Sequence, residues 1–127
     1  MVVLPTALPA AAGWAFSDYV SLTQQSQPAT GGTATIELPQ LDHDEQWLID
    51  RLVVTCTSTT STALRLYDSA VTLARLLDTT ATGNLNTADY PAGLLVRPSS
   101  VLIAQWTNAS TGAVGSLTVQ ARKLVRG

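Results

Sequence analysis

The chain has 127 residues, of which 46% are hydrophobic and only 13% are charged, and its net charge at pH 7 is -2. A length of this order fits one domain, which buries enough surface to fold without a metal or a disulfide. The slightly acidic balance argues against nucleic-acid binding, which requires clustered basic residues, and the one basic cluster, Arg122, Lys123 and Arg126, predicts a solvated strand edge. Average proteins carry about 25% charged residues. The low charge therefore favours a protein that associates with partners or with its own copies, and a soluble monomer that uses few charges is the alternative.

Cys56 is the only cysteine, so no disulfide can form within the chain. It lies in the apolar run 52–56, which predicts a buried, unreactive thiol. A nucleophilic cysteine would need a histidine partner, and His43 is the only histidine. The first residues lack the basic start and long apolar core of a signal peptide, and no apolar stretch reaches about 18 residues. We therefore expect neither a signal peptide nor a membrane-spanning helix.

Residues 1–30 differ in composition from the rest of the chain. Three prolines interrupt them, and proline is unfavourable inside a long helix or a central strand. We therefore predict an extended N-terminal arm over residues 1–30, followed by a hinge at Gly31–Gly32 and a β-sandwich domain over residues 31–127.

Three aromatic residues of this arm, Trp14, Phe16 and Tyr19, lie close together in the sequence. Aromatic side chains on an irregular segment often anchor that segment in a groove of a partner. We predict these three residues as assembly contacts. The alternative is that they cover the core of their own domain.

From residue 33 onward the chain alternates strand signals with turn residues. Residues 33–38 are rich in β-branched side chains and stop at Pro39, which predicts a short strand. Residues 47–57 give the strongest strand pattern. Their apolar residues occupy both faces, as in a strand that is covered on both sides or contains a bulge. The Ser/Thr tract over 57–62 predicts a turn.

Residues 63–77 fit two interpretations. As strands, they place Leu64 and Leu66 on one face; as a helix, they form an apolar stripe opposite Arg65 and Asp68. The periodicity alone slightly favours the helix. Because the neighbouring segments are strand-like, we predict a strand with a short helical turn.

The last part of the chain predicts a loop and then further strands. Residues 78–91 are rich in turn-forming residues and are predicted as a loop. Strands are expected over three later segments, 94–97, 101–107 and 114–125. Short strands at this regular spacing are typical of a β-sandwich or a jelly roll, so we predict an all-β domain.

One dense polar cluster, Asp42-His43-Asp44-Glu45, is a candidate metal site. Carboxylates with a histidine can bind a divalent metal, but neighbouring side chains of an extended chain point to opposite sides. Asp42 and Glu45 also match a helix-start box before Trp47. The segment is therefore predicted as a turn or cap, and no metal site is predicted.

Two further sets of residues were weighed as binding sites. Asp78, Asn84, Asn86 and Asp89 do not have the spacing of the twelve-residue calcium loop. A second set, Tyr67, Tyr90 and Trp106, can form a sugar-stacking platform, but these residues are more simply core or rim aromatics. We predict no catalytic residue, no cofactor and no metal.

The order of several segments carries a resemblance to a known family. Residues 47–54 (WLIDRLVV) are followed by residues 64–70 (LRLYDSA), a glycine-bearing loop and a closing hairpin over residues 101–112. This order resembles the small β-sandwich virion proteins of tailed bacteriophages, especially those that infect actinobacteria. The similarity spans about residues 33–124, and these motifs contain no catalytic residue.

The resemblance implies a non-enzymatic structural protein of the virion. The implied role is capsid decoration, as a minor capsid or cement protein that binds the shell through its N-terminal arm and through oligomer contacts. The implied partners are copies of itself, often as a homotrimer, and other virion proteins such as the major capsid protein, with no nucleic acid and no membrane. The implied location is the phage particle, after assembly in the host cytoplasm.

The alternative function is a receptor- or glycan-binding module of a tail, collar or head fibre. The two functions differ in where aromatic side chains are expected. Decoration predicts that Trp14, Phe16 and Tyr19 are buried against a neighbouring chain. Recognition predicts an exposed aromatic pocket with polar partners at the distal loops.

Overall fold

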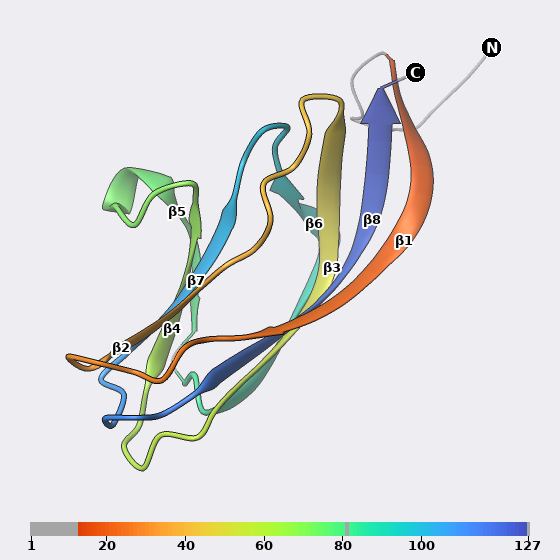
Figure 1. The fold of residues 1–127 in the computed structure, drawn as a ribbon. Helices are drawn as coiled ribbons and strands as arrows, with labels where there is room; N and C mark the ends of the chain where they lie inside the picture. The colour runs from red at the N-terminus through yellow and green to blue at the C-terminus, as the bar shows by residue number, and fades with distance from the viewer. Residues whose placement is uncertain (1–12, 81, 127) are drawn as a thin grey trace.

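The computed structural model describes residues 13–80 and 82–126, which form two four-stranded antiparallel sheets packed face to face (Figure 1). Sheet A has the order β1 (Trp14–Gln25), β8 (Gly115–Arg126), β3 (Glu45–Cys56) and β6 (Leu85–Val96). Sheet B has the order β2 (Thr33–Glu37), β7 (Leu102–Thr107), β4 (Ala63–Asp68) and β5 (Leu76–Thr80). The predicted all-β sandwich is confirmed. In these ranges no helix has the length and apolar character needed to cross a membrane.

Most of the predicted strands are present near their expected bounds. The strand predicted over 47–57 is β3, and its pairing shifts register between Ile49 and Arg51, which confirms a bulge. Residues 63–77 form β4, a 3-10 helix η1 (Leu73–Arg75) and the start of β5, so the interpretation as strand plus helical turn is confirmed. The neighbouring strands supply hydrogen bonds on both sides of β4, which outweighs the helical periodicity.

The predicted loop over residues 78–91 is wrong for most of its length. Strand β5 continues to Thr80, and β6 begins at Leu85, nine residues before the predicted start at Leu94. The first half of β6 pairs with β3 from Leu85–Thr55 to Asp89–Arg51. Because β6 and β5 are edge strands, polar and turn-forming residues are tolerated there, and this tolerance obscured the strand signal.

The structure also differs from the prediction that residues 1–30 form an arm outside the domain. Residues 14–25 form β1, which pairs with β8 along its whole length and is an edge of sheet A. Its inward side chains Val20 and Leu22 pack against the core. An edge strand fits here because no proline lies between Gly13 and Gln27. Residues 1–12 of the predicted arm lie outside the described residues.

Trp106 lies at the centre of the core between the sheets. It is completely buried, and its indole Nε1 donates a hydrogen bond of 2.9 Å to the carbonyl oxygen of Gly83. A Cβ atom added to Gly115 would lie 2.6 Å from Cε3 and Cζ3 of the indole, and one added to Gly83 would lie 2.7 Å from Cδ1. The ring therefore requires glycine at both positions.

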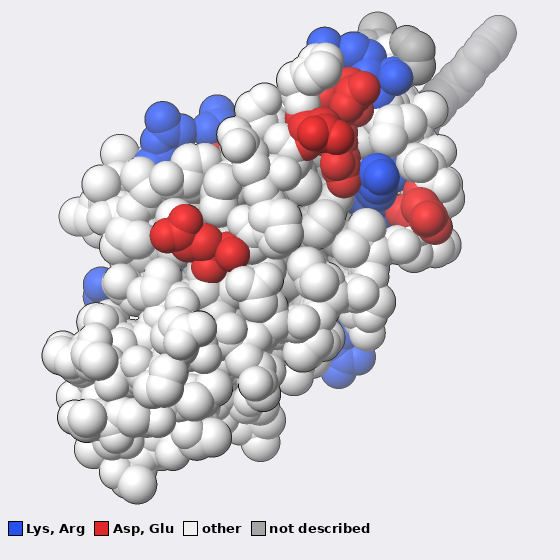
Figure 2. Space-filling model, viewed as in Figure 1, with Lys and Arg blue, Asp and Glu red and all other residues white. Residues whose placement is uncertain are grey.

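Charged side chains are unevenly distributed along the sandwich. The four connections at one end carry none; they cover residues 26–32, 57–62, 82–84 and 108–114. Figure 2 shows this end, at the lower left, without blue or red. Its polar groups bond to each other instead: Thr60 Oγ1 donates to the Asn108 carbonyl oxygen at 2.6 Å, and Asn108 Nδ2 donates to the Ser61 carbonyl oxygen at 2.9 Å.

We expect Gly115→Ala to destabilise the protein by about 1–3 kcal/mol, because the added methyl group overpacks against Trp106. In a Trp106→Leu background the same substitution should cost less, since the atoms that it meets are gone. Urea unfolding of the four proteins of this double-mutant cycle measures both costs. An equal cost of Gly115→Ala in both backgrounds would contradict the contact with the indole.

Candidate functional site

The three predicted assembly residues all lie on the edge strand β1. Trp14 is half-buried, and the Arg126 guanidinium lies over its ring at 4.9 Å from the ring centroid. Phe16 and Tyr19 are 52% and 74% exposed. Their ring centroids are 5.0 Å apart with an interplanar angle of 61°, which is a favourable edge-to-face arrangement. Trp14 is thus engaged within the domain, whereas Phe16 and Tyr19 present an aromatic pair to solvent.

A β-bulge brings Phe16 and Tyr19 onto the same face of sheet A. The pairing runs from Phe16–Leu124 directly to Asp18–Lys123, so β1 contains one more residue than β8 in this interval. Residues three apart in a regular strand point to opposite faces, and one bulged residue reverses that alternation. Without the bulge, the two rings would lie on opposite sides of the sheet.

The outer face of sheet A, the side turned away from sheet B, is the more apolar of the two outer faces. Of the six large hydrophobic residues that are exposed within residues 13–80 and 82–126, four lie on it: Phe16, Tyr19, Leu85 and Leu95. The corresponding face of sheet B carries mostly polar exposed residues, among them Thr33, Thr35, Glu37, Arg65 and Thr79. Exposed apolar side chains gathered on one face are typical of an interaction surface.

Four charged residues on the outer face of sheet A form two ion pairs. Arg122 Nη2 lies 2.9 Å from Asp50 Oδ1, and Arg51 Nε lies 3.7 Å from Asp89 Oδ1. All four side chains are at least one-third exposed, so each pair contributes at most about 1 kcal/mol to folding. Because each pair joins one arginine to one aspartate, the two pairs together carry no net charge.

An open hollow of about 350 Å³ lies beside the aromatic pair. It is lined by Tyr19 and Ser21 from β1, Gln120 and Ala121 from β8, and Asp50 from the bulge of β3, together with Val20. Tyr19 is therefore both the most exposed large side chain of β1 and one wall of this hollow. A protrusion and a depression lie next to each other on one face.

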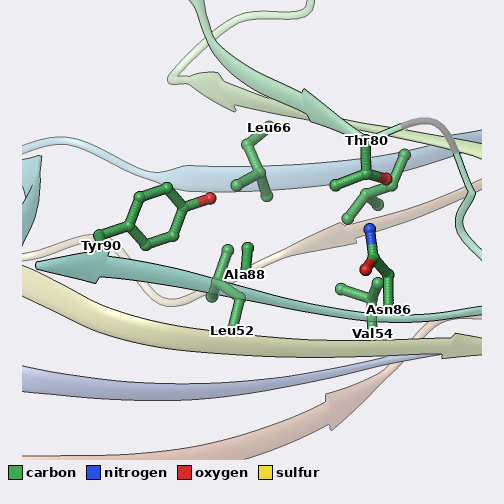
Figure 3. A pocket seen from close by; sticks show the side chains of 8 residues that line it. Leu52, Val54, Leu66, Thr80, Asn86, Ala88 and Tyr90 are labelled. Atoms are coloured by element: carbon green, nitrogen blue, oxygen red, sulfur yellow. The ribbon is translucent and has the colours of Figure 1, made fainter.

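A second, much smaller space, of about 10 Å³, lies between the sheets at the edge formed by β5 and β6 (Figure 3). Figure 3 shows mainly aliphatic side chains around it, including Leu52, Leu66 and Ala88. Tyr90 donates a hydrogen bond of 2.6 Å to Asp78 Oδ2, and burial together with this contact raises the pKa of Tyr90. The phenol therefore stays protonated at neutral pH and holds Asp78 of β5 to β6.

The polar cluster at Asp42–Glu45 is a turn, as predicted, but the alternative of a helix start is wrong, because β3 begins at Glu45. Glu45 Oε2 accepts a hydrogen bond of 2.8 Å from Trp47 Nε1 and lies 3.8 Å from Lys123 Nζ. The carboxylate therefore serves the packing of β3. Across residues 13–80 and 82–126, no three His, Cys, Asp or Glu residues are grouped so that they could hold a metal ion.

The residues weighed for calcium binding have separate structural partners. The Asn84 side chain accepts hydrogen bonds from the backbone N–H and hydroxyl of Thr62 and donates to the carbonyl oxygens of Ser58 and Thr60. All its bonds therefore hold the β3–β4 connection. Asp78 bonds to Tyr90 instead.

The candidate sugar-stacking platform is not formed. Tyr67 is 4% exposed and Trp106 is completely buried, so neither ring has a free face. Cys56 is buried, as predicted. The aromatic residues weighed for recognition therefore serve packing, in agreement with the simpler interpretation of them.

Asp68 and Arg97 form an ion pair that the sequence analysis did not identify. Arg97 donates from Nε at 2.9 Å and from Nη2 at 2.6 Å to Asp68 Oδ2, and the Ser69 hydroxyl donates to Oδ1 at 2.8 Å. Burial raises the pKa of Asp68, but the hydrogen bonds from Ser69, Arg97 and Ser100 and the charge of Arg97 outweigh it, so the net pKa is lowered. No local pattern links residues 29 positions apart, and only the fold reveals this pair.

Neither family models nor curated protein sequences match the chain. Among solved structures, a protein of the disulfide-linked pili that form Bacillus endospore appendages is 15% identical, with a TM-score of 0.48, and the match covers 96% of this chain and 100% of that chain. A chain of the infectious bursal disease virus Gx strain is 13% identical, with a TM-score of 0.45 and coverage of 99% and 37%. A chain of the cyanophage Pam1 capsid asymmetric unit is 20% identical, with a TM-score of 0.40 and coverage of 97% and 94%. These TM-scores and identities support no conclusion about the function of this chain.

We expect Asp68→Asn to lower the free energy of unfolding at pH 7 by about 1–3 kcal/mol, because Arg97 loses its charged partner. A carboxyl whose pKa is lower in the folded state stabilises the protein above its unfolded-state pKa of about 3.9. This stabilisation disappears as the pH falls through the folded-state pKa. The difference between wild type and variant, followed by urea unfolding from pH 7 downward, should therefore shrink in acid.

Asp89→Asn is the matched control for this experiment, because Asp89 is exposed and its ion pair with Arg51 is longer. It should change the free energy of unfolding by less than about 0.5 kcal/mol. A pH-independent difference between wild type and Asp68→Asn would contradict the role assigned to the Asp68 charge.

Proposed function

We propose that this protein is a non-enzymatic structural protein of a tailed-phage virion, with capsid decoration as its role. It binds the shell through its N-terminal residues and through contacts between its own copies. Its partners are the major capsid protein and other virion proteins, and its oligomer is a homotrimer, as the family resemblance implies. Assembly takes place in the host cytoplasm, and neither nucleic acid nor a membrane is a partner.

The observation that carries the proposal is the exposed aromatic pair at the start of β1. Phe16 and Tyr19 lie on the outer face of the edge strand rather than over the core of their own domain. A large aromatic side chain that stays exposed keeps a large apolar area in contact with water, and association with a partner buries that area. Such residues are enriched at protein–protein interfaces. This favours the assembly role over the alternative of covering the core.

The residues that precede β1 support an attachment role. Residues 1–12 contain no charged side chain and include Val2, Val3, Leu4 and Leu8. This uncharged segment joins the domain at Trp14, beside Arg126 and next to the aromatic pair. An apolar segment next to exposed aromatics suits a contact with another protein subunit.

The distribution of aromatic residues favours decoration over receptor or glycan recognition. All seven aromatic residues lie in strands: Trp14, Phe16, Tyr19, Trp47, Tyr67, Tyr90 and Trp106. The connecting segments at both ends of the sandwich therefore contain no aromatic side chain with which to build a distal recognition pocket. The ion pairs and hydrogen bonds of Asp50, Asp68, Asp78 and Glu45 also assign these carboxylates to structure rather than to catalysis.

The proposal is tested by replacing residues 1–12 with a Gly/Ser segment of equal length and measuring incorporation into particles of the phage that encodes the chain. We expect incorporation to fall to background, because the apolar attachment segment is lost. The melting temperature should stay unchanged, since β1 is intact. Removal of residues 1–30 is unsuitable as a test because it also removes an edge strand of the sandwich.

Leu73→Ser is the matched control for this replacement. Leu73 is 85% exposed in the β4–β5 connection, so the substitution removes a large apolar side chain without touching the N-terminal segment or β1. It should be incorporated as the wild type is. Wild-type incorporation of the protein with the Gly/Ser segment would overturn the attachment role.

A further inference from the structure

We infer that the outer face of sheet A is the contact surface between copies of this chain, with the Phe16–Tyr19 pair of one copy entering the hollow of another. The inference deepens the proposed function, on which it rests for the expectation of an oligomer. To the proposed oligomer the inference adds the contact surface, which is the outer face of sheet A, and the two features that meet there, which are the aromatic pair and the hollow.

The first feature is the protrusion. Phe16 and Tyr19 contact each other edge to face, so each ring limits the motion of the other. A pre-ordered aromatic pair loses little conformational entropy on binding, which makes it an efficient anchor. The bulge of β1 holds both rings on the outer face, as the register with β8 shows.

The second feature is the hollow beside it. Ser21 and Gln120 supply neutral hydrogen-bonding groups, and Asp50 is already paired with Arg122 at 2.9 Å. Its volume of about 350 Å³ lies at the lower end of the range of roughly 300–1,000 Å³ typical of sites that enclose small organic groups. The hollow therefore has the size for an aromatic ring and a polar partner for a phenol hydroxyl group.

Further copies of the chain are the occupant that satisfies both features. Each copy offers an aromatic pair for the hollow of a second copy and a hollow for the aromatic pair of a third, and head-to-tail contacts of this kind can close into the ring of the proposed homotrimer. The ion pairs Arg122–Asp50 and Arg51–Asp89 carry no net charge themselves, and the remaining positive charge of Arg126 lies over the Trp14 ring. Because the two ion pairs alternate in sign across the face, they impose no overall repulsion between identical surfaces.

The contact is tested by sedimentation velocity on the purified full chain over a range of concentrations. We expect the wild type to form oligomers. The double variant Phe16→Ser/Tyr19→Ser, which removes the protrusion, should associate at least about tenfold more weakly, as expected for loss of an interface anchor. Gln120→Trp, which fills the hollow, should weaken association as strongly, whereas Leu73→Ser should associate as the wild type does.

A mixing experiment separates this contact from a loss of folding. The single variant Phe16→Ser, which should also weaken association, keeps every residue that lines the hollow, and Gln120→Trp keeps an intact aromatic pair. A mixture of these two variants should therefore associate more strongly than either variant alone, because the aromatic pair of one meets the intact hollow of the other. Misfolded variants would not complement each other in this way.

Three outcomes would overturn the inference. These are a wild type that stays monomeric at every concentration, variants that associate as the wild type does, and oligomers that require residues 1–12 but neither Tyr19 nor Gln120. The last outcome would assign the contact to the N-terminal segment. Failure of the proposed function is seen separately, as a chain that forms these oligomers but never joins a particle.

Discussion

Strand β1 pairs with β8 from Trp14–Arg126 to Gln25–Ser116 and forms one edge of sheet A. The proposed contact surface depends on this pairing. The hydrogen bonds hold an irregular, proline-flanked sequence as a strand. The single bulge in the pairing turns Phe16 and Tyr19 to the same face. If β1 left the sheet, β8 would become an open edge, Val20 and Leu22 would leave the core, and the aromatic pair would lose its common orientation.

The molecule has two ends of different character, and this difference fits a protein that is held in a fixed orientation. One end is an uncharged set of connections whose hydroxyl and amide groups bond to each other. At the other end Arg126 pairs with Trp14 and its backbone N–H donates to the Asp44 carbonyl oxygen, and Figure 2 shows red and blue side chains at this upper end. The proposed attachment segment, residues 1–12, therefore joins the domain at its charged end, while the aromatic pair lies on the side of the sandwich.

Several elements were predictable from local patterns, and others were not. Residues 114–125 alternate apolar and polar side chains, and they form β8 with Leu117, Val119 and Ala121 buried. In contrast, β6 was interpreted mostly as a loop, because an edge strand can contain Pro91 and polar residues without exposing the core. The sequence predicts Trp14, Phe16 and Tyr19 alike as assembly contacts. In the structure Trp14 differs from the other two, because the Arg126 guanidinium lies over its ring.

The sequence by itself determined the all-β class, the burial of Cys56 and the short helical turn before β5, because alternation, β-branching and turn residues act between near neighbours in the chain. Only the tertiary structure decided that residues 14–25 belong to the sandwich. It alone also paired Asp68 with Arg97 and placed Phe16, Tyr19 and the hollow on one face. These features depend on which strands become neighbours, and that choice arises from packing the whole chain rather than from any one segment.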